Sequence, residues 1–175
     1  IYSMTDRNDR EHDQKEGIGR MFDSIAWRYD FLNHLLSFGI DRRWRKRAVK
    51  EISGNFRNPE ILDVATGTGD PDIEATRLKT VKITGIDNYE NMQKIGQRKV
   101  AEKNLQNLID FVRCESENIC FKDETFDVAM VAFGVRNFTD PVRGLSEMRR
   151  VLRRNGMIVV LEFSRPDGTI FKHLY

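Results

Sequence analysis

The sequence has few cysteines and no long apolar run. Only two of its 175 residues are cysteine, Cys114 and Cys120, which is too few for a disulfide framework, and neither has the Cys/His spacing of a zinc site. No apolar stretch approaches the ~20 residues that a membrane-spanning helix needs. No signal-peptide pattern opens the chain. We therefore expect a cytoplasmic protein without a metal site.

The sequence also lacks an excess of charge of one sign. It has 29 Lys and Arg residues against 27 Asp and Glu residues, a net charge of +2. Nucleic-acid recognition needs clustered basic residues, so this balance indicates no nucleic-acid partner. One basic cluster occurs, at residues 42–47. It can contact anionic lipid headgroups, with about 1 kcal/mol per cation near the surface, or it can be a solvated helix face.

The chain begins with two regions of different composition. Residues 1–16 are polar and charged, and we expect a disordered leader there. Residues 17–56 carry apolar side chains at three- and four-residue steps, which is typical of amphipathic helices. Asp41 is a predicted N-cap for the second of these helices, which runs to about Ile52. This region is expected to form a helical cap over the rest of the chain.

From residue 57 to residue 175, short apolar segments alternate with helical ones. The predicted strands are 61–65, 81–87, 108–114, 126–133 and 157–163. Asp70 and Asp140 are predicted caps of two intervening helices, and the second of these is expected to bury Val142 and to end at Gly156. This alternation indicates an α/β domain with a doubly wound, Rossmann-like sheet.

A glycine-rich turn follows the first predicted strand directly. Its sequence is Thr-Gly-Thr-Gly-Asp, at residues 66–70, and glycines allow a tight turn and close approach to a ligand. Asp87 ends the second predicted strand, 20 residues after Gly67, where a carboxylate can accept both ribose hydroxyls of an adenosine. The third glycine of the dinucleotide fingerprint is replaced by Asp72, and no phosphate loop is present.

With Asp63 at the end of the preceding strand, the turn resembles motif I of class I methyltransferases. The resemblance implies S-adenosyl-L-methionine as the cofactor, with its ammonium near Asp63 and its ribose on Asp87. It also places the adenine edge after the third strand. The cofactor-binding residues expected on this basis are Asp63, Gly67, Thr68, Gly69, Asp87, Glu115 and Ser116.

Longer motifs resemble those of the ubiquinone/menaquinone biosynthesis C-methyltransferases. Residues 29–44 are similar to the first signature of this family, and residues 150–156 with 161–166 to the second. Residues 132–138 look like the family's loop after the fourth strand. The resemblance implies methyl transfer from S-adenosylmethionine to a ring carbon of a polyprenylated quinol. It also implies a final antiparallel pair of strands, which we expect to be missing from this sequence.

The family's reaction suggests roles for four residues. Arg136 lies just after the fourth strand, where a fixed positive charge can lower the pKa of the substrate's phenol. Asn137 can donate a hydrogen bond to a ring oxygen, and Tyr29 can hold the ring from the capping helix. Asp41, which stands where many members have His, or a water molecule can accept the proton. A purely structural alternative pairs Arg136 with Asp140.

Other methyltransferases, for small molecules or nucleic acids, remain open, and so does a non-catalytic binding subunit. A nucleic-acid methyltransferase would share the cofactor half of the fold, although base-modifying amino-methylases usually carry an Asn/Asp-Pro-Pro-aromatic run where this chain has Ala-Phe-Gly-Val-Arg-Asn. A non-catalytic binding subunit could also keep the fold, but the intact turn and Asp87 favour a functional site. The residues do not choose between naphthoquinol and benzoquinol rings, and they do not give the oligomeric state.

Overall fold

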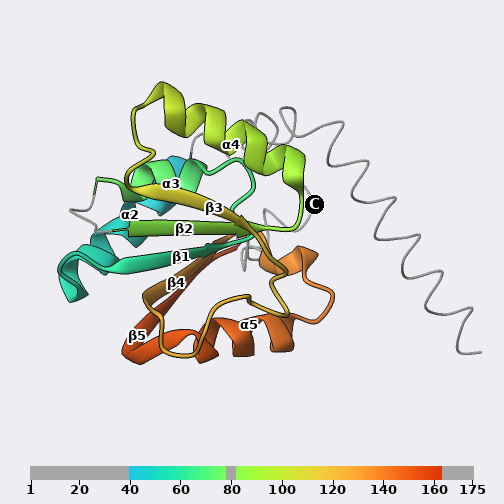
Figure 1. The fold of residues 1–175 in the computed structure, drawn as a ribbon. Coiled ribbons are helices and arrows are strands. Elements are labelled where there is room, and N and C mark those ends of the chain that lie inside the picture. Colours follow the sequence, from blue (N-terminus) through green and yellow to red (C-terminus); the bar gives the residue numbers. More distant parts are fainter. Residues whose placement is uncertain (1–39, 78–81, 163–175) are drawn as a thin grey trace, which may run out of the picture.

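The computed structural model describes residues 40–77 and 82–162, and five parallel strands form its sheet (Figure 1). The strand order is β3-β2-β1-β4-β5. The strands are β1 (Glu60–Val64), β2 (Lys82–Asp87), β3 (Ile109–Arg113), β4 (Phe126–Ala132) and β5 (Leu152–Leu161). The helices are α2 (Ile40–Asn55), α3 (Asp70–Ala75), α4 (Glu90–Glu102), the 3-10 helix η1 (Val135–Asn137) and α5 (Pro141–Arg150). The predicted doubly wound α/β sheet is confirmed.

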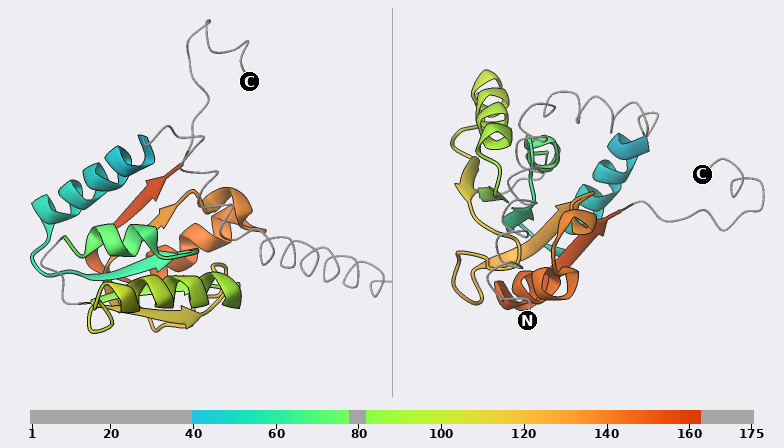
Figure 2. Two further views of the ribbon diagram at one scale, coloured as in Figure 1. Left: turned by 90° about the horizontal axis from the view of Figure 1, so that it is seen from above. Right: turned by 90° about the vertical axis from the view of Figure 1, so that its right-hand side faces the viewer.

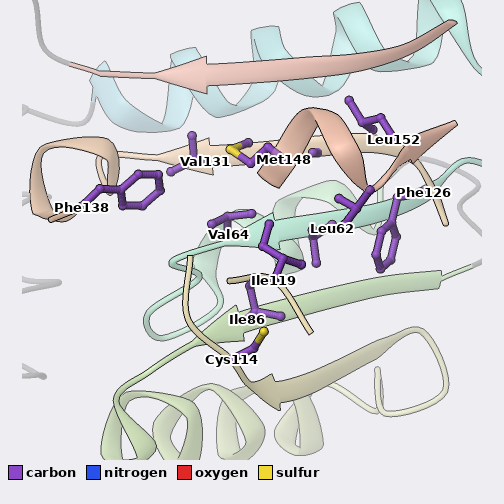
Figure 3. Packing of buried hydrophobic residues seen from close by; sticks show 12 residues of the cluster. Leu62, Val64, Ile86, Cys114, Ile119, Phe126, Val131, Phe138, Met148 and Leu152 are labelled. Carbon is purple, nitrogen blue, oxygen red and sulfur yellow. The ribbon is translucent and has the colours of Figure 1, made fainter. Parts of the chain in front are cut away.

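Helices cover both faces of this sheet. Helices α2, α3 and α4 lie on one face and α5 on the other (Figure 2). Each face of the sheet has its own hydrophobic core. Along β1, Ile61 packs in the core beneath α2, α3 and α4, whereas Leu62 and Val64 pack in the core beneath α5, because successive strand side chains point to opposite faces. By the same alternation, Asp63 faces α3. The core beneath α5 also contains Met148 of that helix (Figure 3).

The start of α2 differs from the prediction. The helix includes Ile40 and Asp41 and continues to Asn55, so Asp41 is not its N-cap. The leader at 1–16, the earlier helix of the predicted cap and Tyr29 lie outside the described residues, as does the side chain of Asp41. Within the two described segments, no helix combines the length and apolarity that a membrane crossing requires.

Helix α5 confirms one expectation and contradicts another. The Asp140 carboxylate caps the helix by accepting a hydrogen bond from the Arg143 amide, at 3.0 Å. Val142, however, is 76% exposed, so the prediction that it is buried is wrong. Gly144 and Met148 form the buried stripe. Val142 precedes Gly144 by two residues, which places it on the opposite side of the helix.

The last strand begins earlier than predicted. Helix α5 ends at Arg150 and β5 starts at Leu152, so the prediction that Gly156 ends the helix is wrong. Pairing with β4 passes from Phe126↔Leu152 to Val128↔Met157 across an irregularity. Residues 153–156 lie within this irregularity at the start of β5, where Asn155 has φ +65°, and the sequence did not distinguish them from a helix end.

Candidate cofactor and substrate site

A cavity of about 210 Å³ opens at the carboxyl ends of β1, β2 and β4. Its walls come from the glycine-rich turn and the segments 87–89, 115–117 and 132–139. The chain leaves β1 toward β2 on one side, and β4 lies on the other side, so the cavity sits where the winding of the sheet reverses. Ligands of open α/β sheets bind at this place.

The structure brings most of the predicted site residues to this cavity. Those on its wall are Gly67, Thr68, Asp87, Glu115, Ser116 and Asn137. Three others, Asp63, Gly69 and Arg136, are not on the wall. Gly69 belongs to the turn but does not face the cavity. Asp63 is buried, and Arg136 is partly exposed.

The glycine-rich turn requires glycine at residue 69. Gly69 has φ +75°, a left-handed conformation, and a Cβ there would lie 2.7 Å from Cζ of Phe111. Its amide donates to the Thr66 carbonyl at 3.0 Å, which closes the turn. Gly69 is also the N-cap residue of α3, so the prediction that Asp70 caps this helix is wrong. Asp70 is instead the first residue of the helix.

A lysine on α4 holds the turn from outside the cavity. Lys99 Nζ donates to Thr68 Oγ1 at 2.8 Å and to Asp70 Oδ1 at 3.0 Å. The other oxygen of Asp70 lies 3.7 Å from Nη1 of Arg45 on α2. Asp70 therefore connects the turn to helices on both sides of it.

Asp87 is held in place by backbone amides. The Gly67 amide donates to Oδ2 at 2.9 Å, and the Tyr89 amide donates to Oδ1 at 2.8 Å. Burial raises the pKa of this carboxyl, and these amide donors partly offset the shift. Each carboxylate oxygen can accept more than one hydrogen bond. Asp87 can therefore keep its amide partners and still accept a pair of ligand hydroxyls from the cavity.

The basic run at 42–47 does not form a single surface. Arg43, Lys46 and Arg47 are exposed, but the side chain of Arg45 is only 16% exposed and lines the cavity. The interpretation of the whole run as a membrane or solvent face is therefore wrong for Arg45. Its spacing from Val49 and Ile52, which pack in the core, could have revealed its inward position.

Asp63 lies beneath the cavity and is completely buried. Its pKa is raised well above the ordinary value, first by burial and then by the negative charge of Asp72. Asp72, on α3, is also completely buried. The sequence singled out Asp72 only as a departure from the dinucleotide fingerprint.

The loop after β4 forms the other wall. Asn137 faces the cavity, whereas Arg136 is 43% exposed and lies beside it. Arg136 Nε donates to the Phe133 carbonyl at 3.2 Å, and its Nη2 lies 3.5 Å from Glu162 Oε1. Asp140, the partner that the structural alternative suggested, caps α5 instead.

Several wall residues were not predicted from the sequence. They are Arg45, Ala65, Thr66, Pro71, Asn88, Tyr89, Glu117, Phe133, Gly134, Phe138 and Thr139. Asn88 and Tyr89 directly follow the predicted strand end at Asp87, and this position could have indicated that they lie on the wall. Ala132 and the buried Met92 lie on the wall too.

Solved structures share this fold. A SAM-dependent methyltransferase from Aquifex aeolicus is 24% identical, with a TM-score of 0.63 over 71% of this chain and 66% of the other. The [4+2]-cyclase SpnF is 23% identical, with a TM-score of 0.72 over 86% of this chain and 61% of the other. Because one fold carries these different activities, the fold alone does not identify the reaction.

Sequence comparison is more specific. The protein is 51% identical to the ubiquinone/menaquinone biosynthesis C-methyltransferase UbiE of Geotalea daltonii, over 91% of this chain and 68% of the relative. It is 44% identical to the demethylmenaquinone methyltransferase of Bacteroides fragilis, over 93% of this chain and 66% of the relative. The chain thus spans about two thirds of the length of these relatives. Residues 8–175 match the ubiE/COQ5 methyltransferase family, and the chain belongs to that family.

Proposed function

We propose that this protein transfers a methyl group from S-adenosylmethionine to a ring carbon of a polyprenylated quinol. The observation that carries the proposal is Asp87, held by the Gly67 and Tyr89 amides on the wall of the cavity, in a chain of the ubiE/COQ5 family. The choice of a quinol as substrate follows the relatives, which are named for ubiquinone/menaquinone biosynthesis and for demethylmenaquinone methylation.

The chemistry of the cavity wall fits the cofactor. Asp87 offers acceptors for ribose hydroxyls, and Glu115 with Ser116 offers polar groups for the adenine edge. Arg45 brings a cation to the same wall, beside Asp70, and can attract the cofactor's carboxylate. When bound, S-adenosylmethionine supplies an electrophilic methyl group on its sulfonium.

The loop after β4 supports the substrate side of the proposal. The guanidinium of Arg136 can lower the pKa of a quinol hydroxyl that approaches it, which increases electron density on the adjacent ring carbon. Asn137, on the cavity wall, can donate to a ring oxygen and orient the ring. Tyr29 and Asp41 keep the roles proposed from the family resemblance, as a contact from the cap and as a proton acceptor.

The substrate's apolar tail favours contact with a membrane surface. On α2, the side chains of Arg43, Lys46 and Arg47 are exposed, and Trp44 is 37% exposed. Three exposed cations near an anionic surface contribute about 1 kcal/mol each. We propose that this part of α2 brings the protein to the bilayer in which the quinol resides.

The test is methyl incorporation by the full chain. It is incubated with methyl-labelled S-adenosylmethionine and, separately, with short-tailed demethylnaphthoquinol and demethylbenzoquinol. We expect label in a new methyl group on the ring of at least one product, less of this label with Asp87→Ala at limiting cofactor, and an unchanged rate in Asp110→Asn. Cofactor binding without methylation of either quinol would favour a non-catalytic subunit or a methyltransferase for another small molecule.

A further inference from the structure

Two buried carboxyl groups meet beneath the glycine-rich turn. Asp63 of β1 and Asp72 of α3 both have no exposed surface. The Thr66 hydroxyl donates to Oδ2 of Asp72. In the sheet, Asp63 is paired with Gly85 of β2 on one side and with Met130 of β4 on the other. Neither neighbour has a charge.

Gly85 provides the space for this pair. A Cβ at residue 85 would lie 2.9 Å from Thr66 Oγ1 and 3.1 Å from Asp72 Oδ2. Any larger residue would therefore displace Thr66 or Asp72 from the positions that they occupy. The contact between the carboxyl groups and the turn depends on a glycine in the neighbouring strand.

The charged groups around the pair do not neutralise it. Arg45 of α2 attracts the Asp63 carboxylate, but this is the weakest of the influences on the pKa of Asp63, and Arg45 also lies near Asp70. Asp70 of α3 adds further negative charge. Lys99 of α4 donates to Thr68 and Asp70.

If both carboxyl groups were ionised, most of their oxygens would lack a well-placed hydrogen-bond donor. Within residues 40–77 and 82–162, neither oxygen of Asp63 nor Oδ1 of Asp72 has a hydrogen-bond partner of good geometry. The Thr66 hydroxyl, which donates to Oδ2 of Asp72, also acts to lower the pKa of Asp63, but burial outweighs it. Buried charged oxygens without donors are strongly unfavourable. A single proton on Asp63 would create a donor for Asp72, while Asp72 would still accept from Thr66 through its other oxygen.

We propose that Asp63 and Asp72 share one proton, and that Asp72 is thereby a positioning residue for the cofactor-binding turn. The inference rests on the proposed function, since it concerns the site for S-adenosylmethionine. The shared proton would join Asp63 to Asp72, the Thr66 hydroxyl donates to Asp72, and the amide of the neighbouring Gly67 donates to Asp87. The buried pair is thus connected to the group that receives the ribose.

The direction of the pKa shifts agrees with this arrangement. Burial raises the pKa of Asp72 to about 7 and that of Asp63 well above its ordinary value. A raised pKa in the folded state means that the protonated form is favoured by folding. As the pH rises through about 7, Asp72 releases its proton and a single proton remains on the pair, and this proton is lost as the pH rises through the raised pKa of Asp63. Two adjacent buried charges then repel each other and displace the turn.

The experiment compares the full chain with Asp72→Asn, measuring S-adenosylmethionine affinity by calorimetry from about pH 7 to about pH 9.5. The asparagine amide can donate to an ionised Asp63 and its carbonyl can accept from Thr66, so no shared proton is needed. We expect similar affinities near pH 7. Above the pKa of the pair, the parent should lose up to about tenfold in affinity per pH unit relative to the variant. The cofactor's amino group, which titrates at about 7.7–8.0, affects both proteins equally.

An infrared measurement on the apo protein provides the second readout. The parent should show the carbonyl band of a buried protonated carboxyl group at about pH 8, above the ordinary carboxyl pKa. Asp72→Asn should remove the band, and Asp110→Asn, on the surface, should keep it. Parallel affinity profiles for parent and Asp72→Asn, or absence of the band in the parent, would overturn the inference. If the chain binds no S-adenosylmethionine even near pH 7, the proposed function fails, while the infrared band still decides the shared proton.

Discussion

On the side of the cavity formed by β1 and β2, backbone amides and the partly buried Lys99 hold the functional groups. On the side formed by the loop after β4, the corresponding groups are exposed side chains. Asp87 has two amide donors and is 8% exposed. Arg136 and Asn137 lie on the short helix η1, and Arg136 is 43% exposed.

The difference indicates that one wall contributes mainly to cofactor binding and the other mainly to the reaction rate. Groups that are fixed before a ligand arrives contribute to binding without a further loss of conformational entropy. Exposed groups become ordered only when a substrate reaches them, so they are expected to affect the reaction rate more than cofactor affinity. Substitutions on the two walls therefore test this difference.

Arg136→Ala should slow methyl transfer and leave cofactor affinity unchanged. Loss of an oriented charge near a developing phenolate is typically worth ~2.7–4 kcal/mol, or about 10²–10³ in rate. Arg136→Lys keeps the charge but not the planar guanidinium, so it should lie between the two. The rate should recover partly at high pH, where the quinol ionises unaided. A rate-versus-pH series with a short-tailed quinol measures this, and a parent-like rate for Arg136→Ala near neutral pH would make Arg136 a structural partner of Glu162.

Gly69→Ala should destabilise the protein and weaken cofactor binding together. A left-handed residue with a Cβ, placed 2.7 Å from Phe111 Cζ, should lower the free energy of unfolding by ~2–4 kcal/mol. The matched control is Gly54→Ala on α2, where a Cβ would meet nothing within 4 Å and should be neutral or slightly stabilising. Denaturant unfolding gives both values, and equal stability of the two variants would mean that the turn is not constrained as described.

Asp87→Ala should weaken S-adenosylmethionine binding by ~1–3 kcal/mol, the scale of hydrogen bonds to a charged group. Calorimetry measures the affinity, and circular dichroism verifies that the variant is folded. Because burial raises the pKa of Asp87, the parent's affinity should fall as acidification through that raised pKa neutralises the acceptor. Unchanged affinity in a folded Asp87→Ala would remove Asp87 from the cofactor site and would reduce the contrast between the two walls.

The smallest effect is expected for Asp110→Asn. Asp110 pairs with Lys82 at 2.7 Å, but both side chains are 52% exposed, and such surface pairs contribute ~0–1 kcal/mol. Thermal unfolding should show this small loss, with affinity and rate equal to those of the parent. A selective loss of cofactor binding in Asp110→Asn would mean that the proposed location of the cofactor site, at the carboxyl ends of the strands, is wrong.

Sequence analysis located the elements well where local patterns were strong. The apolar strands at β1, β2, β3 and β4 were placed within one or two residues, because buried parallel strands are continuous apolar runs. The Asp140 cap was also identified. Errors occurred where side-chain chemistry permitted two positions, as for Asp70, which can cap a helix or begin one. They also occurred at residues 153–156, where an irregular strand start and a helix end use similar residues.

The sequence by itself determined the sheet, the glycine-rich turn and the position of Asp87, because strand patterns, turn geometry and spacing along the chain are local properties. The tertiary structure alone decided which of these groups meet. Arg45 lines the cavity instead of joining its neighbours at the surface, because α2 packs Val49 and Ile52 into the core. Asp72 reaches Thr66, and Asp63 lies opposite a glycine, because strand register and helix packing align them. Such contacts depend on the pairing of distant segments, which no local pattern specifies.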